Sequence, residues 1–231
     1  MTPKNHGEAL IKRLDKRNET LISQLMDSPF CERFFSDTTP TNLIELMTAN
    51  LLEQVHGYGN ELTRAISTAL GRLARYPHFL SQIRPLYECL LGEVAHPRMA
   101  HEDSIKLAKT AGQNSRPTAT AFAVAAIVRM LCEERHPLTH LGFFYLLEGT
   151  TSIMAPRLSE ILQARRIESP FVTVHATEDS QHAATLTKEI QHIVNIDPAV
   201  ADEIEYGYDC FATAYPLPVW NAALDCALSA T

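Results

Sequence analysis

The 231-residue sequence has no apolar run of the ~18 residues that a membrane-spanning helix needs. Its five cysteines are odd in number and widely spaced, and no two of them form a Cys-x-x-Cys pair. Neither a disulfide framework nor a zinc ribbon is therefore indicated. Residues 1–8 are polar and lack the apolar centre of a signal peptide. These absences predict a cytoplasmic protein.

The sequence is also short of basic residues, with 20 Lys and Arg against 27 Asp and Glu and a net charge of −7. Nucleic acids and anionic membranes are usually bound by basic faces. We therefore expect neither as a partner and expect a small-molecule substrate instead. Formation of a homodimer is compatible with the sequence.

Strand-like alternation is nearly absent, whereas apolar residues recur at helical spacing along the chain. The pattern predicts helices over residues 10–25, 43–73, 79–94, 102–111, 118–134, 138–164, 171–194, 198–215 and around Trp220. We expect Thr41 to cap the second helix, Gly57 and Gly59 to bend or break it, and the Ala-rich helix 118–134 to be buried. Pro85 and Pro156 are expected kinks. One all-α bundle of seven to nine helices, a single domain over residues 1–231, is the economical interpretation.

The most informative motif is His175-Ala-Thr-Glu-Asp179-Ser-Gln-His182. At 3.6 residues per turn, positions i, i+4 and i+7 fall within a sector of about 60°, so two imidazoles and a carboxylate project from one stripe. Apolar neighbours such as Val172 and Leu186 indicate that this stripe faces inward. The arrangement suits a divalent metal with N and O ligands. The alternative is a solvated polar stripe on a surface helix.

Other segments offer further ligands. Glu148 is a lone carboxylate in an apolar helix, which is costly unless it is paired or metal-bound. Glu93 ends one apolar helix, and His101 begins the next after an expected break at Pro97. His96 competes with His101 for the same role.

Glu53 and His56 form another pair at i and i+3, in the helix expected over residues 43–73. They are candidates for a supplementary ligand or for a partner that orients a ligand. A plain polar face is the alternative.

The strongest candidates amount to three histidines and three carboxylates, a set typical of a carboxylate-bridged dimetal site inside a helical bundle. They are Glu93, His101, Glu148, His175, Asp179 and His182. The type case of such bundles carries Glu-x-x-His on two helices. This chain has that spacing at Glu93 and His96, but the other half of its candidate site is His175-x-x-x-Asp179-x-x-His182, so the chain is not ferritin-like by motif.

These residues, above all His175-x-x-x-Asp179-x-x-His182, resemble the haem-oxygenase-like diiron oxidases and oxygenases over most of the chain. That family includes relatives of the chlamydial protein associating with death domains and, more distantly, thiaminase II and the pyrroloquinoline-quinone synthase. The resemblance implies a seven-helix haem-oxygenase-like fold, two Fe(II) ions and O2 as co-substrate. It assigns one metal to Glu93, His101 and His182, and the other to Glu148, His175 and Asp179.

The function expected from this resemblance is oxidation of a small amino-acid-like or acyl substrate, by N-oxygenation or by oxidative C–C or C–N cleavage. An external reductant is compatible with such chemistry. An apolar pocket is expected from aromatic and aliphatic residues, namely Phe143, Phe144, Leu147, Phe171 and Trp220. Three cations, Arg98, Arg157 and Lys188, are available for a substrate carboxylate, and the sequence does not select among them.

Three alternatives remain open. A thiaminase II-like hydrolase on the same fold would use a cysteine nucleophile, for which Cys132 is the candidate. A self-processing diiron protein would consume a tyrosine near the metals, and Tyr145 lies one turn from Glu148. A non-enzymatic carrier of haem or metal is the third alternative.

Overall fold

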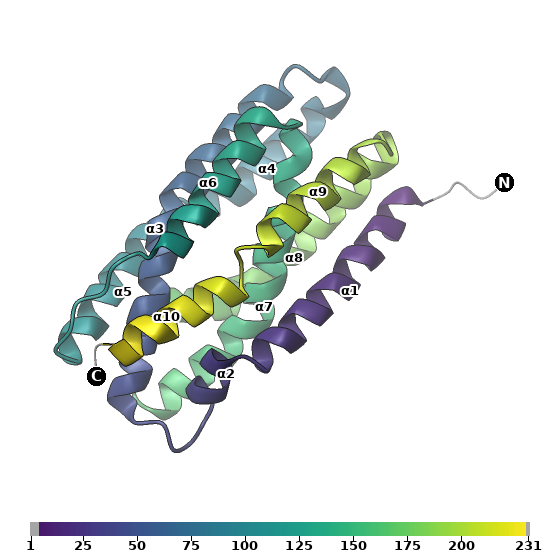
Figure 1. Cartoon of the computed structure of the whole chain (residues 1–231). Coiled ribbons are helices and arrows are strands. Elements are labelled where there is room, and N and C mark those ends of the chain that lie inside the picture. The colour runs from purple at the N-terminus through teal and green to yellow at the C-terminus, as the bar shows by residue number, and fades with distance from the viewer. Residues whose placement is uncertain (1–4, 230–231) are drawn as a thin grey trace.

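The computed structural model describes residues 5–229, apart from the side chain of Cys89, and this part of the chain forms helices without any β-strand (Figure 1). The α-helices are α1 (His6–Met26), α2 (Pro29–Phe34), α3 (Thr41–Leu73), α4 (Leu80–Glu93), α5 (His96–Thr110), α6 (Ala119–Glu134), α7 (His140–Ala164), α8 (Pro170–Ile196), α9 (Val200–Ala212) and α10 (Leu217–Ser229). Two 3-10 turns, η1 (Pro77–Phe79) and η2 (Pro137–Thr139), precede α4 and α7. The all-α prediction is confirmed, but the described chain contains more helices than the seven that the resemblance implied. None of them combines the length and the apolar character that crossing a bilayer requires.

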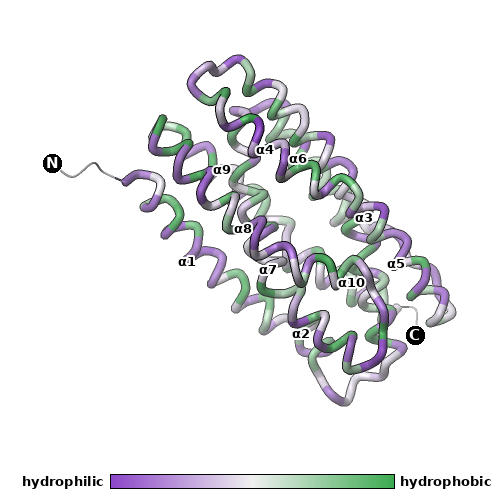
Figure 2. The backbone as a smooth tube through the Cα atoms, turned by 180° about the vertical axis from the view of Figure 1, so that it is seen from behind, coloured by the Kyte–Doolittle hydropathy of each residue, from purple (hydrophilic) through white to green (hydrophobic). Residues whose placement is uncertain are grey.

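Two long helices organise the bundle. Helix α3 packs against α5, α6 and α10, and α7 packs against α8 and α9, with α1 lying along α8 (Figure 1). Hydrophobic and hydrophilic residues alternate along the tube at helical spacing, as expected for amphipathic helices around one core (Figure 2). The apolar residues that face inward, among them Leu141, Phe143 and Leu146 of α7, are fully buried.

Helix α3 is continuous, so of the bend or break expected at its glycines the break is wrong. A Cβ at Gly57 would lie 2.7 Å from Cβ of Pro117, and a Cβ at Gly59 would lie 2.8 Å from Cγ of Pro97. The two glycines therefore allow neighbouring backbone segments to approach α3 closely instead of interrupting it. Thr41 is the first residue of the helix, and no side chain caps it.

Helix α5 begins six residues earlier than expected. Pro97 lies in its first turn, where the missing N–H costs nothing and the fixed φ suits a helix. As a result Glu93, the last residue of α4, and His96, the first residue of α5, are separated only by a tight turn at residues 94–95. His101 lies more than one turn further along α5.

Two further expectations concern α7 and α6. Helix α7 runs through Pro156 without a break, and α4 likewise contains Pro85, so the kinks expected at these prolines remain predictions. Helix α6 is buried on one face only, because Phe122 is 59% exposed while Val124 and Leu131 are fully buried.

Candidate metal centre

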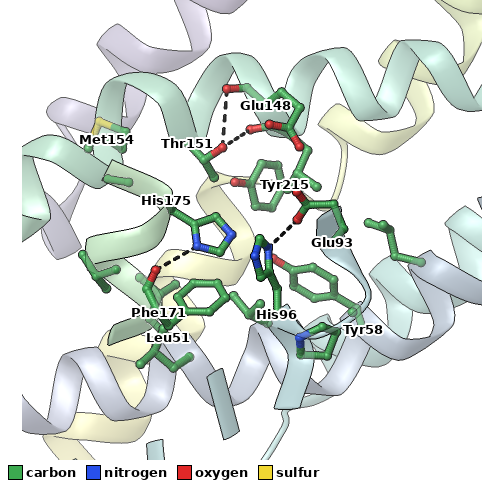
Figure 3. A pocket seen from close by; sticks show the side chains of 18 of the residues that line it. Leu51, Tyr58, Glu93, His96, Glu148, Thr151, Met154, Phe171, His175 and Tyr215 are labelled. Atoms are coloured by element: carbon green, nitrogen blue, oxygen red, sulfur yellow. Dashed lines mark hydrogen bonds and ion pairs between the residues drawn. The ribbon is translucent and has the colours of Figure 1, made fainter. Parts of the chain in front are cut away.

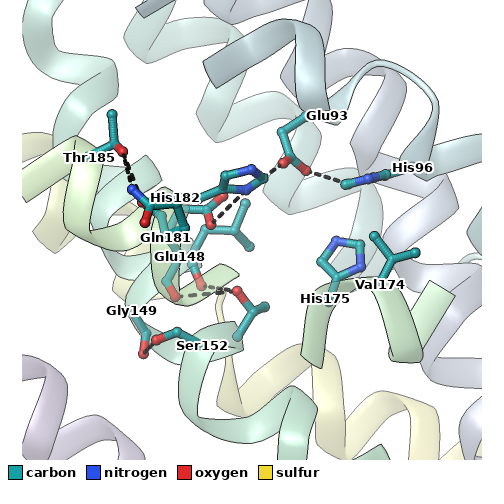
Figure 4. Close-up of polar contacts among 12 residues, drawn as sticks. Glu93, His96, Glu148, Gly149, Ser152, Val174, His175, Gln181, His182 and Thr185 are labelled. Atoms are coloured by element: carbon teal, nitrogen blue, oxygen red, sulfur yellow. Dashed lines mark hydrogen bonds and ion pairs between the residues drawn. The ribbon is translucent and has the colours of Figure 1, made fainter. Parts of the chain in front are cut away.

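Four helices bring together six side chains of the kinds that bind metals, of which Figure 3 shows Glu93, His96, Glu148 and His175, and Figure 4 adds His182. We call this group the inner cluster; its members are Glu93 of α4, His96 of α5, Glu148 of α7, and His175, Asp179 and His182 of α8. Helices α7 and α8 pack closely along their length. The stripe of His175, Asp179 and His182 on α8 faces inward, as predicted.

Glu93 lies between two histidines from different helices (Figure 4). Its Oε2 is 2.6 Å from Nδ1 of His96, and its Oε1 is 3.1 Å from Nδ1 of His182. The same His182 nitrogen is 3.8 Å from Oε2 of Glu148. One carboxylate therefore offers one oxygen to each side of the cluster.

His175 is oriented by its own helix. Its Nδ1 lies 2.8 Å from the carbonyl oxygen of Phe171, which can only accept, so Nδ1 carries the proton and Nε2 keeps a lone pair. The ring centroid is 4.4 Å from that of His96 (Figure 3). A backbone hydrogen bond that fixes the tautomer in this way is typical of metal-ligating histidines.

The inner cluster contains buried carboxylates whose negative charge the neighbouring side chains do not fully neutralise. Glu148 is 3% exposed and Asp179 is 1% exposed. The buried Oε1 of Glu93 has only the His182 imidazole beside it, whereas Glu148 Oε2 and Asp179 Oδ2 are fully buried and have no hydrogen-bond partner among the described residues. Buried polar atoms nearly always have one, and a buried carboxylate without compensation is costly. A divalent cation would supply the missing partner for the oxygens of Glu148 and Asp179.

The pKa values follow from this crowding of acids. Burial, and then the charges of Glu93 and Asp179, hold the pKa of Glu148 well above its ordinary value. Burial also raises the pKa of Asp179 to about 7. For Glu93, burial opposes ionisation, but hydrogen bonds with His182 and His96 outweigh it and lower the pKa. Without a cation, protons must therefore sit on part of the acid set.

The pKa values of the histidines also shift in opposite directions. Burial lowers the pKa of His175 to about 4, so this imidazole is neutral and able to act as a ligand. Burial acts in the same direction on His96, but its hydrogen bond with Glu93 raises the pKa overall. A bound cation would displace the protons from His96 and from the carboxyl groups, because metals bind deprotonated ligands.

Two sets of three ligand atoms are close enough to share an ion. In each set all atoms lie within 4.8 Å of one another, and Glu93 belongs to both: the first is Glu93, His96 and His175, and the second is Glu93, Glu148 and His182. Imidazole nitrogen and carboxylate oxygen are donors that iron accepts. The residues therefore fit a pair of iron ions that share one carboxylate. Asp179 is buried beside these sets without belonging to either.

His101, predicted as a ligand, lies outside the inner cluster. Its Nδ1 is 3.0 Å from Oε2 of Glu53, and its ring stacks on His56. His96 takes the place beside Glu93 instead. The Glu-x-x-His spacing at residues 93–96 was the sequence signal for this arrangement.

An apolar cavity of about 100 Å³ adjoins the cluster (Figure 3). Glu93, His96, Glu148 and His175 contribute to its wall. The rest of the wall is mainly aliphatic and aromatic, and consists of Leu51, Leu52, Val55, Tyr58, Gly59, Leu62, Thr63, Pro97, Leu147, Thr151, Met154, Ala155, Leu158, Phe171, Val172, Tyr215 and Trp220.

The cavity corrects part of the expected lining. Leu147, Phe171 and Trp220 line it as expected, whereas Phe143 and Phe144 are buried elsewhere in the core. The hydroxyl-bearing residues Tyr58 and Tyr215 were not foreseen. Neither Lys nor Arg appears among the described lining residues, so none of the three candidate cations reaches this wall.

The residues named for the alternative functions lie away from the cavity. Cys132 is fully buried at the end of α6, and burial raises the pKa of its thiol, which opposes nucleophilic use. The Tyr145 hydroxyl donates a hydrogen bond to Oδ1 of Asp15 at 2.5 Å. Neither residue lines the cavity.

A buried cluster of histidines and carboxylates in an all-helical bundle is typical of non-haem metalloproteins. Residues 38–215 match the family of iron-containing redox enzymes, and the chain belongs to this haem-oxygenase-like family. A solved structure with the same fold is a CADD-like protein of unknown function from Nostoc punctiforme, at a TM-score of 0.60 and 18% identity, covering 95% of this chain and 99% of that one. No curated protein matches.

Proposed function

We propose that this protein is a non-haem diiron enzyme that uses O2 to oxidise a small, apolar, acyl-type substrate. The observation that carries the proposal is Glu93, whose two oxygens face two different sets of buried ligand atoms. The unpaired oxygens of Glu148 and Asp179 support it, because they give the cluster more negative charge than its histidines neutralise.

In this proposal the first set, Glu93, His96 and His175, holds one iron ion, and the second, Glu93, Glu148 and His182, holds the other. This division differs from the one that the resemblance implied, since His96 replaces His101 and His175 moves to the other ion. Asp179 adds negative charge next to both sets. When bound, a pair of ferrous ions supplies electrons for the reduction of O2, and the substrate and an external reductant supply the remainder.

The lining of the cavity supports the proposed substrate class. Its aliphatic and aromatic walls exclude water and bind a chain by apolar contact, while the ligand side chains occupy one part of the wall. A fatty acid and an amino acid both carry a carboxylate, which a bound iron ion would pair, but the amino acid adds an ammonium group that the apolar part of the wall leaves without a partner. Burial of such a charge is costly unless it is paired, so the cavity favours an acyl substrate. The volume of about 100 Å³ restricts it to a small one.

The first experiment is an anaerobic titration of the metal-free protein with Fe(II), with iron counted per chain and visible absorbance followed after O2 is admitted. We compare wild type with Glu93→Gln, which keeps the size of the side chain but removes its charge. Glu88→Gln, an exposed position on the same helix, is the matched control. We expect Glu93→Gln to lose about two irons per chain, the number that a carboxylate-bridged bundle site holds, together with the O2-dependent absorbance.

Equal iron content and equal O2 response in wild type and Glu93→Gln would contradict the diiron assignment. The substrate class is tested separately by O2 consumption with short-chain fatty acids and with free amino acids. Stimulation by fatty acids is expected. Stimulation by amino acids alone would retain the metal centre but refute the acyl substrate.

A further inference from the structure

A second group of metal-ligating side chains lies where α3 packs against α5. Glu53 and His56 come from α3 and His101 comes from α5, and one ligand atom of each lies within 4.8 Å of the other two. We call these three residues the outer cluster. It shares no residue with the inner cluster, and neither the proposed reaction nor the family match uses it.

Glu53 is the buried member of the outer cluster. Its side chain is 6% exposed, and its Oε2 lies 3.0 Å from Nδ1 of His101. Among the described residues, no Lys or Arg forms an ion pair with it. A carboxylate with so little exposure needs a cation or several hydrogen bonds, and one half-exposed imidazole is a weak source of either.

His56 is oriented as a ligand would be. Its Nδ1 lies 3.1 Å from the carbonyl oxygen of Pro97, so Nδ1 carries the proton and Nε2 keeps a lone pair. Its ring stacks on that of His101 with centroids 4.1 Å apart and an angle of 23° between the planes. The stacking holds the two imidazoles side by side at the contact between α3 and α5.

We propose that the outer cluster binds one divalent transition-metal ion through Glu53, His56 and His101. Two imidazoles and one carboxylate are a ligand set that suits Zn²⁺ or Fe²⁺ and leaves further positions for water. The His101 side chain is 39% exposed, so the ion exchanges with solvent. The ion joins α3 to α5 close to Pro97, which follows inner-cluster residue His96, and it therefore stabilises the start of α5.

The experiment uses Zn²⁺ as the probe and counts bound zinc per chain after removal of weakly held metal. The parent protein is Glu93→Gln, so that the inner cluster contributes little, and the test variant is Glu93→Gln with Glu53→Gln. Glutamine at position 53 still accepts a hydrogen bond from Nδ1 of His101, so the fold is retained while the ligand charge is lost. His192→Ala in the same parent, at an exposed position on α8, is the control.

We expect about one zinc per chain in the parent and in the His192→Ala control, and at least tenfold weaker binding in the Glu53→Gln variant. Zinc should also raise the midpoint of thermal unfolding of the parent more than that of the variant, because an ion that binds only the folded state stabilises it. Equal zinc content and equal midpoint shifts with and without Glu53 would overturn the proposal. If the Glu93→Gln parent does not fold, Glu53→Gln and His192→Ala are made in the wild-type protein instead. The difference in bound zinc per chain between these two variants then decides the question.

Discussion

The inner and outer clusters lie on two sides of the first turns of α5, and they differ in how their charge is balanced. The inner cluster has as many carboxylates as imidazoles, and one oxygen each of Glu148 and Asp179 is buried without a hydrogen-bond partner among the described residues. The outer cluster has one carboxylate, which already pairs with a half-exposed imidazole. Only the inner cluster therefore has a large excess of buried acid that multivalent cations would neutralise.

The separation of the clusters follows from helix geometry. His96 and His101 are five residues apart on α5, which places their side chains about 140° apart around the helix axis. They cannot face the same centre. The side chain that faces inward contacts Glu93, and the one that faces α3 contacts Glu53.

The largest expected difference is between replacements of these two histidines. His96→Ala should abolish the absorbance change that follows Fe(II) loading and exposure to O2, because it removes one imidazole from the set shared with Glu93 and His175. His101→Ala should leave that absorbance change intact. The measurement is stopped-flow absorbance on both variants, with circular dichroism to show that each is still helical. Loss of the signal in His101→Ala alone would restore His101 as the inner ligand.

Helical periodicity was sufficient to predict the fold class and most helices of this chain. Long segments such as α7 and α8 carry unbroken apolar patterns, so their existence follows from the sequence. Residues that act through tertiary packing were misread. Gly57 and Gly59 look like helix breakers locally, but their role depends on Pro117 and Pro97, which are distant in sequence.

The candidate site was predictable where its members share one helix. His175, Asp179 and His182 lie on one face of α8 because their spacing requires it. The position of His96 depends on whether Pro97 ends a helix or begins one, and both readings fit the sequence. The cavity lining depends on which faces of α7 meet α3 and α9, so the absence of Phe143 and Phe144 from it could not be foreseen.

A second prediction concerns the pH dependence of the metal-free protein. Asp179 has a folded-state pKa of about 7 against an ordinary 3.8, so the folded state binds more protons than the unfolded state between these values. Its contribution is fully present below pH 3.8 and is lost as the pH rises to 7, by up to about 4 kcal/mol. His175, whose pKa is lowered to about 4, acts in the opposite direction between pH 4 and its ordinary value of 6.5.

Comparison with Asp179→Asn isolates the carboxyl group, because the effect of His175 is present in both proteins. Urea unfolding of the metal-free proteins at pH 4 and pH 7 should show wild type losing stability relative to Asp179→Asn as the pH rises. Iron should bind wild type more tightly at the higher pH, since it replaces the proton on Asp179. Parallel pH profiles for the two proteins would show that Asp179 is ionised in the metal-free fold.

The smallest effect is expected at the glycine that sets the distance between α3 and α5. In Gly59→Ala the new Cβ would lie 2.8 Å from Cγ of Pro97, and a proline ring in the first turn of a helix cannot rotate away. The start of α5, which carries His96 and supports both clusters, must shift. We expect a loss of roughly 1–3 kcal/mol in the free energy of unfolding, typical of overpacking. Gly71→Ala is the matched control on the same helix, because nothing lies within 4 Å of its Cβ position.

Gly71→Ala should raise the free energy of unfolding by about 0.5–1 kcal/mol, since alanine is the better helix former. The two substitutions are chemically identical, so their opposite signs in urea unfolding would isolate the contact with Pro97. A gain in stability at both positions would mean that α5 can move away from α3 at little cost. The inner and outer clusters would then not be held in register by this contact, and iron binding in Gly59→Ala should equal that of wild type.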